Sequence, residues 1–418
     1  MQLDVEFARR QFPAFCNDET ARWAMFENAG GSYILESVAR RLDHYLRRHR
    51  VQPYGPFGPS RDAGEAMDRG YATIAGMINA HPDEITLGPS TTANTYMLAQ
   101  ALRPSLRPGD EIVVTNQDHE ANIGAWRRLE ELGAVIREWR VDPATGELDT
   151  DDLRTMVSDR TRLVCFSLCS NIVGTFNPAE EIVGIARGAG ALTVADGVSY
   201  APHRVPDVRA LGVDFLLFST YKTYATHLGV LWCHPGTYEV LTNQGHFFND
   251  EEPHYRLNPT GPLHAQIAAL EGLGDYVDTL HTHHFGDTTG SLHSRADRVY
   301  RLFGAQEQRL TEMLLEALRE VPELRVIGQT SAASGTRAGT VSVICESAPA
   351  SRIADALAER GVAARSGHFY ALRLVQAVGV KDTEDGVLRM SLVHYNTEDD
   401  VDRLISGLTE AVSSTRRS

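Results

Sequence analysis

The sequence has few cysteines and no long apolar run. Its five cysteines are an odd number and show no C-x-x-C spacing, which argues against a disulfide framework and against a zinc ribbon. No apolar stretch approaches the length of a membrane span, and the N-terminal residues carry acids where a secretory signal carries cations. We therefore expect a cytoplasmic protein that contacts no membrane.

Positive charge is also scarce. The 40 lysines and arginines are outnumbered by 55 aspartates and glutamates, which gives a formal net charge of −15. Nucleic acids and anionic membranes are bound by basic patches that neutralise phosphates, so neither is an expected partner. The short basic runs at residues 40–41 and 47–48 do not change this expectation.

What the sequence does contain is typical of a globular protein. It has 418 residues, of which 42% are hydrophobic and 23% are charged, with no internal repeat and no low-complexity tract. A chain of this length is too long for one small core. We expect two domains that share one continuous fold, or one large domain with an appendage.

Short apolar runs alternate with stretches of helical period between residues 84 and 233. The runs show little polar alternation, which predicts strands covered on both faces, as in a mostly parallel α/β sheet. Ligands of such sheets gather at the carboxyl ends of the strands. The predicted strands cover residues 111–115, 135–139, 162–168, 191–195, 213–218 and 229–233.

The remainder of the chain predicts a second, smaller unit. Residues 247–289 are rich in His, Asn, Pro and Gly around one apolar, helix-like patch at 264–273, and we expect a long irregular connection there. A helix over 294–321 and strands near 339–344 and 388–393 then indicate an α+β domain. We place the large domain at residues 29–288, the small domain at 289–418, and an N-terminal arm over 1–28 that packs on the small domain.

Three polar side chains follow predicted strands. Lys222 closes the run that begins at residue 213, and Asp196 and Asn171 follow two other strands. A buried ammonium costs several kcal/mol unless it is paired or neutral, and one remedy is a Schiff base with an aldehyde cofactor. Pyridoxal phosphate is such an aldehyde, and its ring nitrogen needs an acid such as Asp196. Taken alone, Lys222 is better explained as a surface lysine after a strand, because most lysines are exposed.

A second group of polar side chains precedes a predicted helix. Ser90, Thr91 and Thr92 stand directly before the apolar pattern of residues 97–102. Hydroxyls and free backbone N–H groups at a helix N-terminus bind phosphate readily. The alternative is a simple N-cap, which uses the same residue types.

Eight short segments occur in the order of a known protein family. They are residues 28–32 (NAGGS), 90–92 (STT), 118–122 (DHEAN), 170–175 (SNIVGT), 195–197 (ADG), 219–222 (STYK), 365–368 (RSGH) and 389–391 (RMS). On these segments the chain resembles the class V aminotransferase family of pyridoxal phosphate enzymes, in the branch of group II cysteine desulfurases and selenocysteine lyases. The resemblance implies fold type I, with a mostly parallel seven-stranded sheet in a large domain and a smaller α+β C-terminal domain.

The resemblance also implies roles around a pyridoxal phosphate ring. Lys222 would carry the cofactor and then move the Cα proton of the substrate. Asp196 would keep the ring nitrogen protonated, His119 would stack on the ring, and Asn171 would bond the ring oxygen. Ser199 stands where the family usually has a glutamine near that oxygen.

The same resemblance assigns a phosphate site. In the family a loop of the neighbouring subunit reaches this phosphate, and residues 256–262 match that loop loosely. We therefore expect a homodimer with shared active sites. The residues implied at the phosphate are Ser90, Thr91, Thr92, Ser219, Tyr221 and, from the neighbouring subunit, Thr260.

The substrate site departs from the family at one position. Arg365 and Arg389 fall where the family binds the substrate carboxylate, and Asn28 is a further expected substrate contact. The family's desulfurases follow the motif at 365–368 with a histidine and a nucleophilic cysteine, but here Phe369 and Tyr370 follow. A tyrosine hydroxyl cannot hold a persulfide. It can protonate a leaving group or exchange a proton at Cα, and the alternative is a packed aromatic side chain.

These observations lead to one expected function and several alternatives. We expect a pyridoxal phosphate enzyme that removes the Cα proton of an amino acid and eliminates a β-substituent, as a C–S lyase or a desulfurase-like enzyme. An epimerase that uses Lys222 and Tyr370, an aminotransferase and a non-catalytic binding protein are the alternatives. Cys169 is expected to be a core residue. The histidines of residues 281–284 read as a solvated stretch, and we expect no metal.

Overall fold

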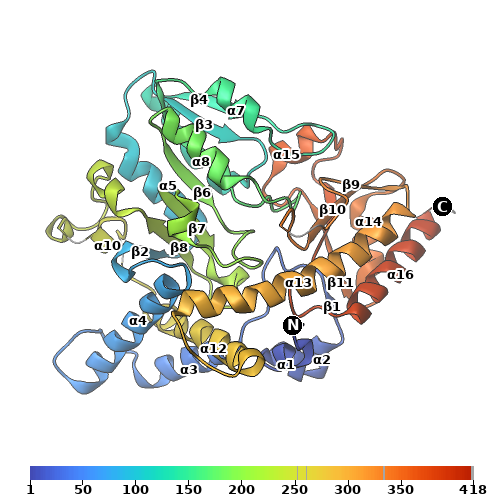
Figure 1. Ribbon diagram of the computed structural model, residues 1–418, viewed down its shortest axis with the longest axis horizontal. Helices are drawn as coiled ribbons and strands as arrows, with labels where there is room; N and C mark the ends of the chain where they lie inside the picture. The colour runs from blue at the N-terminus through green and yellow to red at the C-terminus, as the bar shows by residue number, and fades with distance from the viewer. Residues whose placement is uncertain (252, 260, 333–334, 416–418) are drawn as a thin grey trace.

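The chain folds around one large sheet and one small sheet (Figure 1). The computed structural model describes residues 1–251, 253–259, 261–332 and 335–415. The large sheet has seven strands in the order β2-β8-β7-β6-β5-β3-β4, and only β8 runs antiparallel to its neighbours. The strands are β2 (Ile85–Gly88), β3 (Glu111–Thr115), β4 (Val135–Trp139), β5 (Thr161–Ser167), β6 (Leu192–Asp196), β7 (Phe215–Ser219) and β8 (Gly229–Cys233).

The large sheet is covered on both faces, as its uninterrupted apolar runs predict. Ile112 and Val114 of β3 face one hydrophobic cluster, which includes Leu98 and Trp126. Val113 faces the opposite cluster. The mostly parallel seven-stranded sheet is confirmed, although β2 escaped the sequence analysis because its four residues include only two large apolar side chains.

Helices cover both faces of the large sheet. Those with side chains in the cluster around Val113 include α4 (Gly58–Met77), α8 (Ala179–Gly188), α11 (His264–Ala269) and α12 (Glu271–Phe285). Those on the opposite face are α5 (Thr91–Leu102) and α6 (Gly124–Arg127). Shorter or more peripheral helices are α3 (Glu36–Arg48), α7 (Thr150–Met156), α9 (Val208–Leu211) and α10 (Pro253–Arg256).

The smaller α+β unit is confirmed as well. Its four antiparallel strands lie in the order β12 (Arg365–Gly367), β13 (Val387–Ser391), β10 (Thr340–Cys345) and β9 (Leu324–Val326). Beside them lie α14 (Ala350–Ala358), α15 (Leu372–Ala377), α16 (Glu398–Thr415) and β11 (Val362–Ala363). Within the described ranges, none of the helices combines the length and apolar character that crossing a bilayer requires.

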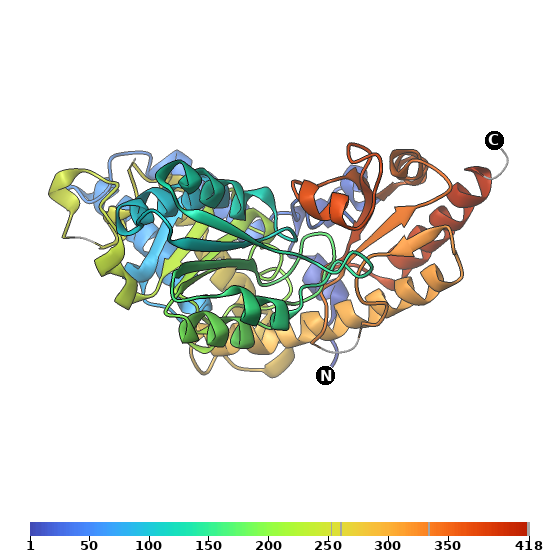
Figure 2. The same cartoon turned by 90° about the horizontal axis from the view of Figure 1, so that it is seen from above.

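One long helix joins the two units. Helix α13 (Leu292–Arg319) has 28 residues and therefore spans about 42 Å. Its first half places Val299 and Phe303 in the large-domain cluster, and its second half places Leu310 and Leu314 in the small-domain cluster. Figures 1 and 2 both show it running from one unit to the other.

The N-terminal arm touches both units. It contains α1 (Val5–Arg9), α2 (Asp18–Ala21) and β1 (Ala24–Met25). Phe12 is buried in the large-domain cluster, whereas Phe26 is buried in the small-domain cluster, where β1 pairs with β11. The division of the chain at residues 28 and 288 stays a prediction.

A loop of the large domain is bound to the small domain by its backbone carbonyls. Ser342 Oγ donates to Ile172 O at 2.7 Å, and Ala338 N donates to Gly174 O at 2.8 Å. Arg389 Nη1 donates to Asn171 O at 3.2 Å. We call this contact, between residues 171–174 and residues 338–342 with Arg389, the domain seam.

The expected irregular connection over residues 247–289 is wrong in its later part. Helix α11 lies in the helix-like patch at 264–273, but α12 extends the helical structure to Phe285, and Leu273, Tyr276, Val277 and Leu280 of α12 are buried. Polar residues among these apolar positions concealed the helical period. The histidine run lies at the end of α12, where His283 stacks on Phe7 of the arm at 3.7 Å between ring centroids.

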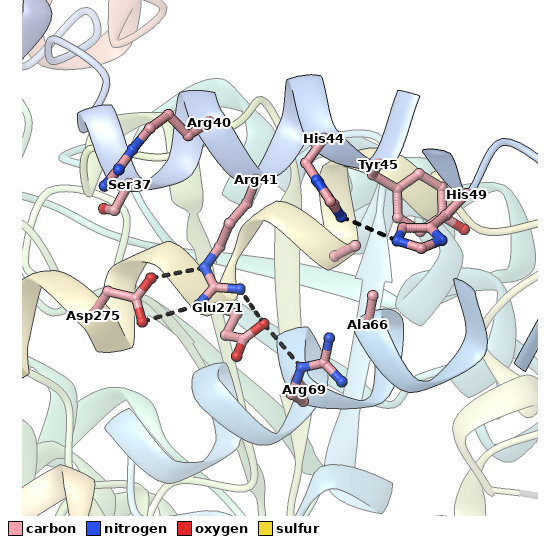
Figure 3. Close-up of a pocket in the computed structure, with 11 residues that line it drawn as sticks. Ser37, Arg40, Arg41, His44, Tyr45, His49, Ala66, Arg69, Glu271 and Asp275 are labelled. Atoms are coloured by element: carbon pink, nitrogen blue, oxygen red, sulfur yellow. Dashed lines mark hydrogen bonds and ion pairs between the residues drawn. The ribbon is translucent and has the colours of Figure 1, made fainter. Parts of the chain in front are cut away.

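An ion-pair cluster ties α3 to α12 and α4 (Figure 3). Arg41 of α3 contacts Asp275 through Nε at 2.7 Å and Nη2 at 3.0 Å, and its Nη1 contacts Glu271. Arg69 of α4 contacts the same Glu271 at 3.0 Å. This bidentate, partly buried arrangement is of the kind that contributes measurable stability.

We predict that Arg41→Met lowers the free energy of unfolding by about 1 kcal/mol, because two carboxylates lose their shared cation while the aliphatic stem is kept. Urea unfolding measures the change. Arg40→Met is the matched control, because Arg40 is exposed and, within the described residues, its one ion pair is a 3.5 Å contact with Glu36. Equal effects of the two substitutions would contradict the role of the cluster.

Candidate active site

Two adjoining cavities lie at the carboxyl ends of β5, β6 and β7. Each has a volume of about 410 Å³. The first, which we call the cofactor cavity, is lined by Asp196 and by the hydroxyls that precede α5. The second, the substrate cavity, is lined by Arg365 and Arg389 of the small domain. The residues common to both are His119, Asn171, Tyr221, Lys222 and Tyr370.

Lys222 stands between the two cavities. It ends a turn of 3-10 helix that follows β7 directly, and it is only 7% exposed. Burial, together with the positive charge of Arg389, lowers the pKa of its amine to about 8, and Asp196 opposes this change. A neutral amine is therefore accessible near neutral pH.

Asp196 ends β6, one strand away from Lys222. Its Oδ1 accepts a hydrogen bond from Val198 N at 2.8 Å. Burial raises the pKa of this carboxyl, while the Val198 hydrogen bond and the charge of Lys222 oppose the rise. A buried carboxylate next to a cavity suits a protonated ring nitrogen as its partner.

His119 is held as a neutral ring. Its Nδ1 accepts a hydrogen bond from Ala121 N at 3.1 Å, which leaves the proton on Nε2. Burial, with the charges of Lys222 and Arg389, lowers its pKa to about 3. The ring lies 5.2 Å from that of Tyr370, centroid to centroid, at an angle of 38°. A flat, uncharged ring at this place can stack on an aromatic ligand.

Asp118 fixes the segment that carries His119. Its Oδ1 accepts from Thr115 Oγ1 at 2.8 Å and from Ser167 N at 3.1 Å, and Asn122 Nδ2 donates to its Oδ2 at 2.6 Å. Burial raises its pKa to about 7. Sequence reasoning missed this residue, although it opens the motif at 118–122.

The hydroxyls near α5 form one end of the cofactor cavity. Ser90 caps α5 by accepting from Ala93 N at 3.1 Å, and Thr91 Oγ1 lies 2.7 Å from Ser219 Oγ. The helix start approaches β8 closely, because a Cβ on Gly229 would lie 2.2 Å from the carbonyl carbon of Ser90. The N-cap of α5 therefore lies at the predicted phosphate site. Thr92 lines the same cavity.

Tyr221 and His227 stack beside these hydroxyls. Their rings are parallel within 1° and their centroids are 4.3 Å apart. Both line the cofactor cavity, and His227 was not singled out in the sequence. Its position five residues after Lys222 was the only available signal.

The cofactor cavity contains buried polar atoms without partners. Among the residues that the structure describes, Asn171 Oδ1 and Ser167 Oγ have no hydrogen-bond partner, although buried oxygens normally have one. Ser199 is buried and lines the same cavity. An amine, a carboxylate and hydroxyls together fit the aldehyde, ring nitrogen and phosphate of pyridoxal phosphate. Asn171 Oδ1 can accept a hydrogen bond from the ring oxygen when that oxygen is a hydroxyl.

Arg389 is buried in the substrate cavity and is held there by several contacts. It is 2% exposed, its Nη2 donates to Glu27 Oε1 at 3.0 Å, and its guanidinium lies 3.7 Å above the ring of Phe369. Burial lowers its pKa and Glu27 opposes this. Arg365 is its direct partner in the β12–β13 register and is exposed. Glu27 is a further residue that sequence reasoning missed.

Tyr370 lies at the rim of both cavities. It is 67% exposed, and its carbonyl accepts from Glu120 N at 2.7 Å. Phe369 and Tyr370 both have left-handed backbone angles, with φ of 48° and 59°. Two such residues in succession are costly and are held only by surrounding contacts, one of which is Asn171 Nδ2 donating to Phe369 O at 3.0 Å.

One predicted residue, Asn28, is not brought to these cavities. Asn28 is buried, and its Nδ2 donates to Ser391 O at 2.8 Å and Met25 O at 3.0 Å, so its amide serves the backbone. It lines neither cavity. Thr260 lies outside the described residues. Among the described residues, no three His, Cys, Asp or Glu side chains gather to hold a metal.

Cys169 is buried, as expected of a core residue, and it also lines the cofactor cavity. Its thiol donates to Gly174 O at 3.5 Å, and burial raises its pKa to about 12. A protonated thiol bonded to a carbonyl is a poor nucleophile.

Comparison with known proteins agrees with this arrangement. The family model described as Aminotransferase class-V matches residues 24–282 and 300–404. The aminotransferase-like protein FGM3 of Gibberella zeae is 37% identical, over 97% of this chain and 98% of that protein. A cysteine desulfurase of Serratia proteamaculans is 30% identical, over 98% of both chains.

A solved structure agrees as well. The cysteine desulfurase of Thermococcus onnurineus NA1 superposes with a TM-score of 0.85 at 23% identity, over 99% of both chains. This likeness confirms the fold-type I architecture. Because the family model covers most of the sequence, the chain belongs to the class V aminotransferase family, in its cysteine desulfurase-like branch.

Proposed function

We propose that this protein is a pyridoxal phosphate enzyme that removes the Cα proton of an amino acid and eliminates a β-substituent, most simply a sulfur-linked one. The single observation that carries the proposal is the position of Lys222 between two cavities, one with Asp196 and hydroxyls and the other with Arg389. The names of the curated relatives, which include cysteine desulfurases, support the same class of chemistry.

The cofactor cavity would hold the cofactor through residues from several elements. Lys222 would hold the aldehyde carbon and Asp196 the ring nitrogen. His119 would face the ring, and Asn171 and Ser199 the ring oxygen. When bound, pyridoxal phosphate supplies an electron-withdrawing ring that stabilises negative charge at the Cα of an amino acid. The proposed phosphate ligands are Ser90, Thr91, Thr92, Ser219 and Tyr221.

The substrate cavity would orient the amino acid. Arg389 presents a planar fork that binds a carboxylate with two hydrogen bonds, and Arg365 adds a second cation at the rim. With the carboxylate on Arg389, the Cα hydrogen would face Lys222. Its neutral amine, favoured by burial, would take the Cα proton. Tyr370 would donate a proton to the leaving group from the rim.

The sulfur would leave without an enzyme-bound persulfide. Of the five cysteines, only Cys169 lines either cavity among the described residues, and its thiol is protonated and bonded to a carbonyl. Sulfide would therefore be released to solvent or to an external acceptor.

We also propose a homodimer located in the cytoplasm. Four large apolar side chains are exposed on two loops of the large domain, namely Tyr54, Phe57, Phe247 and Phe248. Exposed aromatic groups of this kind are typical of protein interfaces. The contribution of Thr260 to a neighbouring active site stays a prediction.

The first test uses the scarcity of lysine. The sequence contains only Lys222 and Lys381. We predict that the purified protein is yellow and that borohydride reduction attaches the cofactor to the peptide of Lys222 alone. Lys222→Ala should be colourless, whereas Lys381→Ala, at an exposed position, should stay yellow. A wild-type protein that stays colourless with added cofactor would refute the proposal.

The second test follows the products. With S-substituted cysteines in deuterated water, we predict pyruvate and a released thiol, and a rate lowered at least about 100-fold in Tyr370→Phe. Cys169→Ala should keep its rate within about twofold, because no persulfide is formed. Deuterium at an inverted Cα without pyruvate would favour an epimerase, and a keto acid that keeps its side chain would favour an aminotransferase.

The third test uses pH. Lys222 must be neutral to react with an aldehyde, so the rate of cofactor uptake by the apoprotein should fall as the pH drops below about 8. Arg389→Met removes a cation that disfavours the charged amine. It should therefore raise the pKa of Lys222 and move the profile to higher pH. Arg365→Met is the control and should leave the profile in place; stopped-flow absorbance measures all three.

A further inference from the structure

Glu27 pairs with the arginine that is proposed to bind the substrate carboxylate. Glu27 Oε1 lies 3.0 Å from Arg389 Nη2. Within the described ranges, Arg389 has no other carboxylate partner. Since Arg389 is fully buried, this ion pair supplies the negative charge that the guanidinium needs when no substrate is bound.

The fold provides a place for the carboxylate of Glu27. A Cβ on Gly30 would lie 2.3 Å from Glu27 Oε1, so any other residue at this position would collide with the carboxylate. Glu27 itself lines the substrate cavity together with Arg389 and Lys222. The carboxylate is therefore housed beside the proposed substrate position.

The ion pair is incomplete. Glu27 Oε2 and Arg389 Nε are both buried and have no hydrogen-bond partner in the described part of the chain, so the ion pair there joins one oxygen to one nitrogen. A carboxylate that binds Arg389 with two oxygens would make the better contact. The other side of the guanidinium is already fixed by Asn171 O and by the ring of Phe369.

We propose that Glu27 is a specificity-determining residue, an internal carboxylate that occupies Arg389 until the α-carboxylate of an amino acid displaces it. This inference rests on the proposed function, because it takes Arg389 as the carboxylate site. Two like charges within one cavity repel each other, so Glu27 opposes every incoming carboxylate.

The consequence is selection for ligands with both an amine and a carboxylate. A simple carboxylate must displace Glu27 with its own contact energy alone. An amino acid is also held through its amine beside Lys222, which raises the effective concentration of its carboxylate at Arg389. Glu27 therefore excludes monofunctional acids from the cavity.

The test compares the cofactor-loaded wild type with Glu27→Gln, which keeps the size of the side chain and removes its charge. Isothermal titration calorimetry measures the binding of propionate, a carboxylate without an amine. We expect Glu27→Gln to bind propionate roughly tenfold more tightly than the wild type does. The ligand-free variant should also unfold at a lower temperature, because Arg389 has lost its counter-charge.

Two further variants sharpen the result. Glu27→Asp keeps the charge but shortens the side chain by one methylene, so that the carboxylate lies farther from Arg389. We expect an intermediate gain in propionate affinity. Glu384→Gln is the matched control, because Glu384 lines the same cavity, is exposed and makes no ion pair in the described part of the chain. It should change neither the propionate affinity nor the unfolding temperature.

The outcomes separate the two proposals. A wild type that binds L-alanine no better than L-alaninamide would overturn the role of Arg389, and the role of Glu27 with it. A preference for L-alanine in the wild type, with unchanged or weaker propionate binding in Glu27→Gln, would overturn the role of Glu27 alone.

Discussion

The active site depends on the domain seam, where the small domain binds the backbone carbonyls of residues 171–174. Asn171 and Lys222 belong to the large domain, whereas Arg389 belongs to the small one. Arg389 Nη1 and Ser342 Oγ each donate to a carbonyl of this loop, and Ile172 and Val173 of the loop pack in one hydrophobic cluster with apolar side chains of the small domain. The position of Arg389 relative to Lys222 is therefore fixed by hydrogen bonds together with apolar packing. Hydrogen bonds are directional, and the two cavities therefore keep a defined geometry where they meet at Lys222.

Much of this site was accessible from the sequence, because successive parallel strands end at the same edge of a sheet. Lys222, Asp196 and Asn171 follow three such strands, and they line one cavity as expected. The order of the strands cannot predict Glu27, because its partner Arg389 lies 362 positions away in the sequence. Asn28 was expected at the substrate because of the matching motif at residues 28–32, but its amide donates to the backbone at residues 25 and 391. Helix α12 was missed because polar side chains interrupt its apolar positions.

The balance of charge is another constraint on the site. The chain is acidic overall, yet its active centre gathers the buried cations Lys222 and Arg389 with Arg365 nearby. Burial lowers the pKa of Lys222 and that of Arg389. The negative charge of Asp196 opposes this change at Lys222, and that of Glu27 opposes it at Arg389. Arginine supplies nearly all other positive charge, since the sequence has only two lysines. An aldehyde that enters this protein thus meets a single buried primary amine.

Helix α13 is shared by the two units. Its two halves are embedded in different hydrophobic clusters, so neither unit can turn without carrying the helix with it. A tilt of about 5° at one end of a rod about 42 Å long displaces the other end by about 4 Å, which exceeds the length of any hydrogen bond at the seam. The orientation of the small domain toward the large sheet therefore depends on helix α13 as well as on the seam, and a proline in the middle of this helix would change that orientation at a distance from Lys222.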